Sequence, residues 1–214
     1  MSIRKLMVVL LLLTLGGIGL AEEGKTPTAP EFEFEFEFPK VPELQSFFQS
    51  YEKDLRDEMN QEFDKAKAEG DIYNPWSLSA GARVTYKGKF WTVMVNGYDY
   101  RGGAHGIPIL DAVYFDPQNF EEISQDALFE KKAYEMLSRW SREGLVKQGY
   151  DKTDEWMLEG TAPKAENFQL VVPGEDGLEV IFSSYQVAPY AAGTPSVEIP
   201  WSVAWTIFKE AYRP

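Results

Sequence analysis

The segment Glu31–Phe38, EFEFEFEF, alternates strictly between an acidic and an aromatic residue. Because successive side chains along a β-strand point to opposite faces, this order places four phenylalanines on one face and four glutamates on the other. The pattern predicts a half-buried strand at the edge of the protein's own sheet. The alternative is an adhesive segment that pairs with another chain, since such strands pair readily with open edges. Pro39 and Pro42 end the strand and open a helix.

The start of the chain has the order of a secretory signal peptide. Arg4 and Lys5 supply positive charge, Leu6–Leu15 is an apolar run, and Gly19–Ala21 has the small-residue form of a cleavage site. The run is short for a membrane span, which needs about 20 residues. We therefore expect cleavage after Ala21 and a secreted or periplasmic protein without a membrane anchor.

The rest of the chain is predicted to hold one folded domain. Residues 22–30 are polar and contain proline, which is typical of a flexible leader between the signal peptide of residues 1–21 and the domain. The remaining residues, 31–214, are enough for a single compact domain.

Composition removes several classes of function. The sequence has 34 acidic and 21 basic side chains and a formal charge of -13, which argues against binding to a phosphate backbone. It has no cysteine and a single histidine, which excludes thiol catalysis and a zinc site built from several imidazoles. We predict no cofactor and no metal site. Binding modules and carboxylate- or serine-based enzymes remain.

Hydrophobic periodicity predicts the order of the remaining elements. Apolar residues spaced three and four apart predict long helices over Glu43–Lys67 and Asp126–Glu143. Apolar runs and period-two alternation predict the other strands, which are Ala82–Tyr86, Phe90–Tyr98, Ile109–Phe115, Phe168–Val172, Leu178–Tyr185 and Ser196–Pro200. A short helix over Ser202–Ala211 ends the chain. This order predicts an α+β fold, in which a mainly antiparallel sheet packs with two long helices and a short C-terminal helix.

Three stretches are unusual for a plain scaffold. They are Tyr98–Gly106 (YDYRGGAHG), Ser184–Gly193 (SYQVAPYAAG) and Val197–Trp201 (VEIPW). Each combines aromatic residues with glycine or proline, which is typical of loops that recognise a partner. We predict no catalytic residue. The residues predicted to bind a ligand or partner are Tyr100, Arg101, Gly103, His105, Tyr185 and Tyr190.

His105 has a structural and a chemical interpretation. As the one histidine of a glycine-rich loop it could serve as a general base or a metal ligand. No G-x-S-x-G motif accompanies it, so we favour a ring that packs on the hairpin end and bonds the backbone of a neighbouring loop. Gly102 and Gly103 are expected to take backbone angles closed to other residues.

The other candidates leave similar alternatives open. Arg101 is expected to pair with Asp116 or Glu198, or else to contact a ligand carboxylate, because a charged residue is rarely buried alone. Tyr185 and Tyr190 are equally suited to partner contact and to closing the hydrophobic core. For Trp201 we favour a place in the core.

The motifs resemble one family. Tyr100–Gly106 (YRGGAHG), Tyr185 with Ala188–Gly193 (APYAAG) and Ile199-Pro200 are similar to the RsiV-like extracellular domains, which also occur beside the catalytic domain of PdaC-type peptidoglycan deacetylases. The resemblance runs from about Glu31 to the C-terminal helix. It implies an α+β domain at the cell envelope, and one member of the family binds lysozyme.

The resemblance therefore implies a non-enzymatic binding protein. Its implied partner is a basic secreted protein such as a lysozyme-like hydrolase. A cell-wall glycan is the less favoured ligand, because envelope polymers are usually anionic and the chain is acidic. The alternative is an enzyme, or its accessory module, that acts on peptidoglycan or a related glycan. A single histidine cannot supply the metal site of the deacetylases, so we expect no deacetylase domain here.

Overall fold

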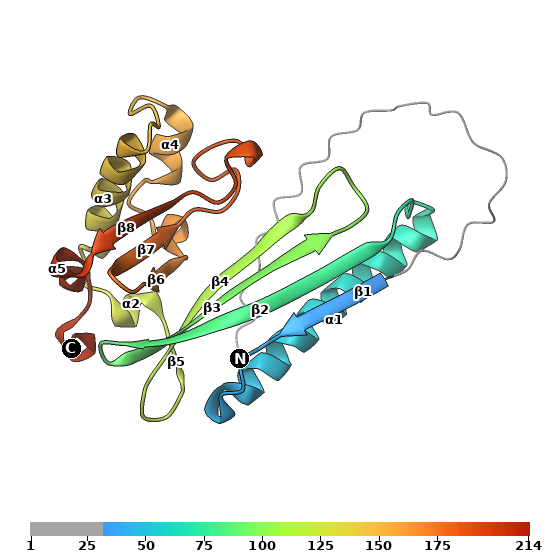
Figure 1. The fold of residues 1–214 in the computed structure, drawn as a ribbon, viewed down its shortest axis with the longest axis horizontal. Coiled ribbons are helices and arrows are strands. Elements are labelled where there is room, and N and C mark those ends of the chain that lie inside the picture. The colour runs from blue at the N-terminus through green and yellow to red at the C-terminus, as the bar shows by residue number, and fades with distance from the viewer. Residues whose placement is uncertain (1–31) are drawn as a thin grey trace.

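A computed structural model describes residues 32–214, and the predicted signal peptide, the predicted leader and Glu31 lie outside the described residues. Five strands form the larger sheet in the order β1-β2-β3-β4-β5 (Figure 1). They are β1 (Phe32–Glu37), β2 (Trp76–Lys87), β3 (Phe90–Tyr100), β4 (Ile107–Phe115) and β5 (Glu122–Ile123). β1 runs parallel to β2, and the other neighbours are antiparallel.

A smaller, antiparallel sheet has the order β6-β7-β8. Its strands are β6 (Val171–Pro173), β7 (Gly177–Ile181) and β8 (Ser196–Pro200). The helices are α1 (Gln45–Glu69), α2 (Gln125–Leu128), α3 (Ala133–Lys147), α4 (Glu155–Gly160) and α5 (Trp201–Ala204). The predicted α+β fold is confirmed, with α1 and α3 as its long helices and a mainly antiparallel pairing of strands. Among residues 32–214, no helix is both long and apolar enough to cross a bilayer.

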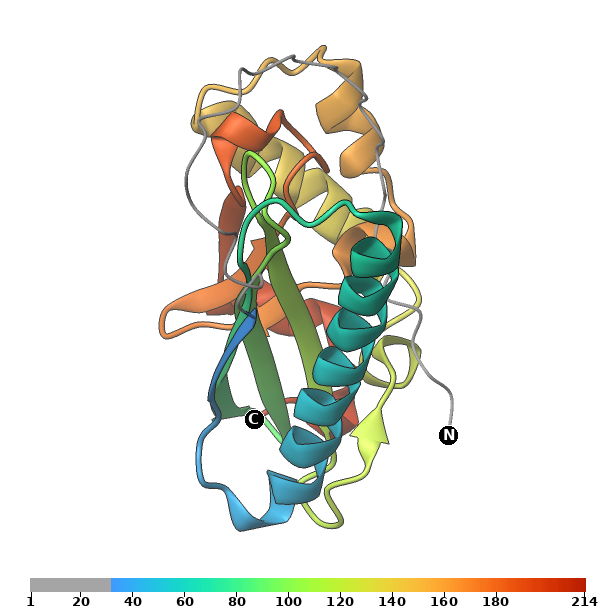
Figure 2. The same ribbon diagram turned by 90° about the vertical axis from the view of Figure 1, so that its right-hand side faces the viewer.

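The alternating segment becomes the edge strand β1. Its phenylalanines are half-buried and its glutamates are exposed, because the phenylalanine face lies toward α1. α1 crosses that face of the larger sheet (Figure 2), and its buried residues Phe48, Leu55 and Met59 share one core with β1–β4.

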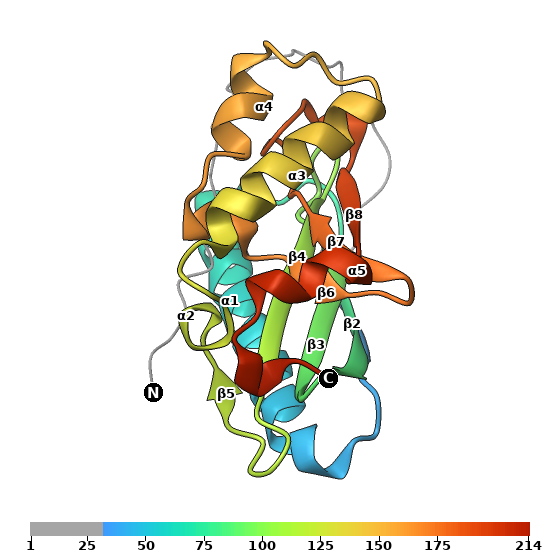
Figure 3. The ribbon, with the colours of Figure 1, turned by 90° about the vertical axis from the view of Figure 1, so that its left-hand side faces the viewer.

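The other face of the larger sheet carries the second core. The smaller sheet, α3 and α5 lie on this side (Figure 3). Phe90 and Tyr114 of the larger sheet belong to the core that holds α3 and the smaller sheet together. The buried hydroxyl of Tyr114 donates to the backbone oxygen of Val171, 2.7 Å away, and so ties β4 to β6. The two faces of one sheet therefore organise the whole described chain.

Two predicted helices are shorter than expected. The helix predicted over Asp126–Glu143 is interrupted, because Phe129 is extended (φ -98, ψ 152) and forms a β-bridge with Phe208. The helix predicted over Ser202–Ala211 is limited to α5, which ends at Ala204. A 3₁₀ turn then leads to Phe208, whose backbone is extended. The two phenylalanine rings lie 5.3 Å apart in the core, so tertiary packing outweighs local helical preference at both places.

Strand bounds in the second half also differ from expectation. Phe168, predicted to begin a strand, lies in a 3₁₀ helix over Ala165–Phe168, and the pairing begins at Val171. The following strand ends at Ile181, because the chain turns away from the sheet over residues 183–186. This early end frees the segment from Ser183 to Gly193, hereafter the 183–193 loop.

Candidate functional site

The β3–β4 connection meets the 183–193 loop at one end of the larger sheet. The His105 ring stacks on the Tyr190 ring with centroids 3.9 Å apart and planes 20° apart. The Tyr190 hydroxyl donates to the backbone oxygen of Gly106 (2.9 Å), whose own N–H donates to the Tyr98 hydroxyl (2.7 Å). Two stretches that lie far apart in the sequence thus form one surface.

Further rings extend this surface. Tyr185 lies 5.6 Å from Tyr190, and Trp156 of α4 stacks on Tyr185 at 6.4 Å with planes 12° apart. Tyr98, Trp156 and Tyr185 are 39%, 42% and 52% exposed, which is unusual for large aromatic side chains held in fixed contact. We call Tyr98, His105, Trp156, Tyr185 and Tyr190 the aromatic surface.

Tyr185 holds its place in a strained backbone conformation. Its φ is 68°, a left-handed value that costs a non-glycine residue roughly 1–2 kcal/mol. The indole N–H of Trp156 donates to the Tyr185 backbone oxygen. Gln186 next to it accepts from Ser183 N–H and donates to the backbone oxygen of Gly160. Strain that the surrounding bonds maintain is typical of sites that present a side chain to a ligand.

The glycines of the β3–β4 connection have three different roles. Gly102 has a φ of 75°, and its oxygen accepts from the Asn74 side chain at 2.7 Å. Gly103 is exposed and lacks the special φ that we expected for it, because the turn needs a left-handed residue at Gly102 alone. At Gly106, a methyl group would lie 2.5 Å from both the Asp99 oxygen and the Tyr98 ring. Gly106 is therefore required by close packing.

Arg101 points away from the aromatic surface. Along β3, residues 93 and 95 face α1, so the alternation places Asp99 and Arg101 on the α1 side and Tyr98 and Tyr100 on the other. Arg101 binds Asp99 at 2.7 Å. Burial lowers the pKa of Arg101, but this bond and the nearby charges of Glu58 and Glu62 raise it on balance.

The prediction that Arg101 pairs with Asp116 or Glu198 is therefore wrong. Asp116 instead accepts from the backbone N–H groups of Gln118 and Asn119 in a turn, and Glu198 lies in β8 of the smaller sheet. Arg101 lies 3.7 Å from Glu58 and 3.8 Å from Glu62, both on α1. Proximity of β3 to α1, which sequence alone does not reveal, decides the pairing.

Tyr100 has the same orientation as Tyr98 and adjoins acidic residues. In the register of the sheet, Glu33 pairs with Ser77 and Ser77 with Tyr100, while Glu35 reaches Tyr98 through Ser79. Strands lie about 4.8 Å apart, so these carboxylates and tyrosines are separated by roughly 10 Å across one face. The aromatic surface is therefore flanked by negative charge.

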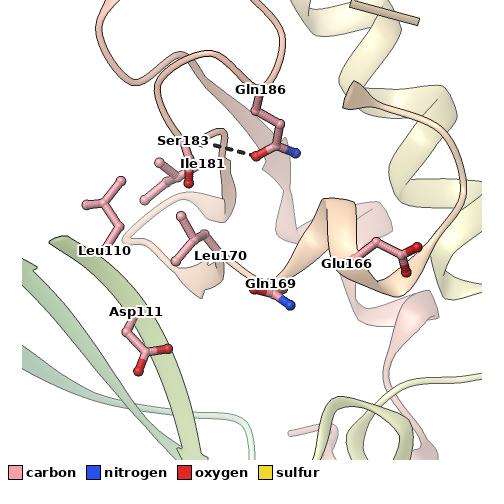
Figure 4. A pocket seen from close by; sticks show the side chains of 8 residues that line it. All are labelled: Leu110, Asp111, Glu166, Gln169, Leu170, Ile181, Ser183 and Gln186. Carbon is pink, nitrogen blue, oxygen red and sulfur yellow. Dashed lines mark hydrogen bonds between the residues drawn. The ribbon is translucent and has the colours of Figure 1, made fainter. Parts of the chain in front are cut away.

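A small cavity near the 183–193 loop is less suited to bind a ligand. A cavity of about 70 Å³ lies between β4 and the segment after β7, lined by residues that include Asp111, Leu170 and Gln186 (Figure 4). Small-molecule sites are usually several hundred Å³, so this space suits water. Trp201 packs against the second core beside Trp205, as favoured above. Within residues 32–214, no group of three or more histidine or acidic side chains could hold a metal ion.

Sequence reasoning missed two members of the aromatic surface. Trp156 stands in Gly149–Glu166, which reads as a long connection with one helical turn at Trp156–Leu158. Tyr98 begins the unusual stretch Tyr98–Gly106, but it reads as the last residue of a strand and is not among the predicted site residues. The signal that could have found Tyr98 is the β3 alternation, which groups it with Tyr100 and separates it from Arg101. For Trp156 there was no comparable signal, because its contact with Tyr185 depends on how α4 packs.

Comparisons with known proteins divide the chain into two matched regions. Residues 29–108 match the family model described as deacetylase PdaC, and residues 121–202 match the model described as a protein of unknown function, DUF3298. The peptidoglycan-N-acetylmuramic acid deacetylase PdaC of Bacillus subtilis (strain 168) is 35% identical over 132 residues. That match covers 60% of this chain and 28% of the relative, so the chain spans little more than a quarter of that protein.

Two solved structures share the fold. A DUF3298 family protein from Pseudomonas aeruginosa PAO1 is similar with a TM-score of 0.55 and 18% identity, over 85% of this chain and 86% of that one. A DUF3298 member from Bacteroides fragilis NCTC 9343 gives 0.51 and 19%, over 80% and 71%. Tyr98 and His105 fall in the first matched region and the other three rings in the second. The chain thus joins a PdaC-like region to a DUF3298-like region, and the aromatic surface lies where the two meet.

Proposed function

We propose that the protein is a non-enzymatic binding module of the cell envelope, of the RsiV-like type. In this proposal the aromatic surface holds a basic envelope-acting protein such as a lysozyme-like hydrolase. The observation that carries the proposal is the row of exposed rings, which hydrogen bonds and stacking fix before any partner arrives. Rigid aromatic side chains are effective anchors, because little conformational entropy is lost when they are covered.

Charge supports a basic partner. The chain carries a formal charge of -13, and the exposed Glu33 and Glu35 flank Tyr98 and Tyr100 on one face. Complementary charge accelerates the encounter of two proteins, whereas a patch of buried rings slows their separation. A basic protein with an apolar contact patch therefore fits this arrangement.

The proposal is tested by titration with a lysozyme. Tyr185→Ala should weaken binding at least tenfold, because hot-spot aromatic residues contribute about 2 kcal/mol or more. Tyr86→Ala is the matched control, since Tyr86 is 49% exposed and contacts Trp91 rather than the aromatic surface. An unrelated protein of equal positive charge is titrated in parallel. Equal binding of both basic proteins, or equal loss in both variants, would contradict the proposal.

The salt dependence of the binding rates distinguishes the contribution of charge from that of the aromatic rings. Rising ionic strength should slow association more than it speeds dissociation, because screening acts mainly on the approach of the partners. Tyr190→Ala should instead speed dissociation, since it removes the ring between His105 and Tyr185. Stopped-flow or surface-binding kinetics measure both rates.

Export is part of the proposal. The relative in Bacillus subtilis is named for peptidoglycan, which lies outside the cytoplasm, and the start of this sequence has the order of a signal peptide. Protein recovered from the periplasm or the medium should begin at Glu22. A mature protein that keeps Leu6–Leu15 would contradict this.

The second candidate is a peptidoglycan-acting enzyme or its accessory module. It is favoured by the name of the relative and by the exposed rings, since aromatic faces also stack on sugars. Incubation with N-acetylated peptidoglycan fragments, with acetate release and binding measured separately, distinguishes the two functions. Acetate release, or glycan binding that Tyr185→Ala abolishes, would favour this second candidate.

A further inference from the structure

The outer edge of β1 is open. Within residues 32–214, β1 pairs with β2 on one side and with no strand on the other. Edge strands are commonly protected by charged side chains, especially lysine, or by proline or a bulge. β1 has no lysine, proline or bulge between Phe32 and Glu37, its only charges are three glutamates on one face, and its register with β2 is unbroken. Its outward N–H and C=O groups can therefore pair with an extended peptide.

The α1 side of this edge can receive apolar side chains. Phe34 and Phe36 remain half-buried although they pack toward α1, and the Arg56 guanidinium lies over their rings at 4.3 and 4.7 Å. A groove of about 380 Å³ lies between the end of β1 and the start of α1. Its lining includes the rings of Phe38 and Phe48. A neighbouring strand could cover these rings from outside.

The opposite side of the edge carries a row of carboxylates. Glu33, Glu35 and Glu37 are exposed, and none has an ion-pair partner in the described part of the chain. They recur at every second residue, or roughly every 6.7 Å along the strand. This spacing equals that of alternate side chains on an added strand.

We infer that β1 binds an extended peptide segment in which Lys or Arg alternates with apolar side chains. The segment adds a strand to the larger sheet, with its cations beside the glutamates and its apolar side chains beside the phenylalanines. A second copy of β1 fits poorly, because its glutamates would lie directly opposite Glu33, Glu35 and Glu37. The inference does not rest on the proposed function, since its backbone pairing uses the edge of β1, although both proposals draw on the charges of Glu33 and Glu35.

Model peptides test this inference. The probe is an acetylated, amidated peptide of four Lys-Val pairs, and binding is measured by fluorescence anisotropy at low ionic strength. A peptide of the same composition in the order Lys-Lys-Val-Val should bind at least tenfold more weakly, because its charges do not match the row. The alternating peptide with methylated backbone nitrogens should lose as much affinity, because it has no backbone N–H groups to donate to the C=O groups of β1. Amide exchange should slow within residues 32–37.

Charge reversal gives the sharpest test. The triple variant Glu33→Lys, Glu35→Lys, Glu37→Lys should lose the Lys-Val peptide and bind a Glu-Val peptide. The matched control reverses three exposed acids of α1, namely Asp54→Lys, Asp64→Lys and Glu69→Lys, with the same change in net charge. This control should retain the original preference.

Several results would overturn the inference. They are equal binding of both lysine peptides, equal loss of Lys-Val peptide binding in the two triple variants, and absence of Lys-Val peptide binding to the wild type. Slow amide exchange in β1 without peptide, together with self-association in sedimentation experiments, would also overturn it. Tyr190→Ala should leave peptide binding unchanged. In this variant, loss of lysozyme binding with retained peptide binding contradicts neither proposal. The two binding assays therefore test the two proposals separately.

Discussion

A graded alanine series in the β3–β4 connection tests how the aromatic surface is held. At Gly106, the new methyl group would lie 2.5 Å from the Asp99 backbone oxygen and from the Tyr98 ring, and 2.7 Å from the next ring atom. The backbone cannot yield easily, so Tyr98 must move and release its bond from Gly106 N–H. Overpacking of about 1–3 kcal/mol and a lost hydrogen bond of about 1 kcal/mol together predict a destabilisation of about 2–4 kcal/mol.

Alanine variants of the two neighbouring glycines provide reference values for this loss of stability. Gly102→Ala forces a side chain into the left-handed region at φ 75° and should cost about 1–2 kcal/mol. Gly103 is exposed, and the nearest atom to an added methyl lies 3.9 Å away, so Gly103→Ala should change stability by less than about 0.5 kcal/mol. Urea unfolding gives the free energy of unfolding for each variant.

The order of the three variants is what the structure predicts. Gly106→Ala should also weaken lysozyme binding more than its stability loss explains, because the displaced Tyr98 belongs to the aromatic surface. If Gly103→Ala costs as much as Gly106→Ala, or if Gly106→Ala is neutral, the close approach at Gly106 is refuted.

Three further changes test the interior. Tyr114→Phe should lower the free energy of unfolding in urea by about 1–3 kcal/mol, because the Val171 oxygen loses its buried donor; a neutral result would contradict a structural role for this bond. Phe48→Ala should cost about 3–5 kcal/mol in the same assay, since the ring is fully buried; a loss below 1 kcal/mol would mean that α1 packs differently. Burial, with the charge and hydrogen bond of Asp126, raises the pKa of Tyr134 to about 12. The unfolded chain releases this proton near pH 10, so the stabilisation is present below pH 10 and lost toward pH 12. Between pH 10 and pH 12, Tyr134→Phe should lose less stability than the wild type. Identical losses in the two proteins would refute the raised pKa of Tyr134.

The packing of β1 on α1 follows closely from sequence pattern, whereas β2 begins at Trp76 and not at the predicted Ala82. Alternation in EFEFEFEF and the spacing of Phe48, Leu55 and Met59 report the same buried interface from its two sides. Both signals are local and periodic, and the burial they predict is the burial observed. Pairing of β1 with β2 in parallel was not predictable, because the choice of neighbour depends on contacts between residues 44 positions apart, such as Phe32 and Trp76.

The second half shows where local pattern fails. Phe129 continues a helical apolar stripe, yet it is extended because its ring and that of Phe208 fill one position in the core. Composition alone indicates that Ser184–Gly193, most of the 183–193 loop, is unusual. Its contact with His105 depends on the left-handed Tyr185 and on the bond from Tyr190 to Gly106, and neither has a periodic signature.

The relative lengths of the strands explain why the aromatic surface is exposed. β3 has 11 residues and β7 has 5, which correspond to roughly 36 and 17 Å. The smaller sheet packs near Met94 and Ala112 and can cover only part of the face opposite α1. Tyr98 and Tyr100 lie beyond that cover, so the same alternation that buries Met94 leaves Tyr98 exposed and Tyr100 half-buried. The 183–193 loop reaches this uncovered end because β7 stops at Ile181. An open aromatic face is therefore a consequence of packing a short sheet on a long one.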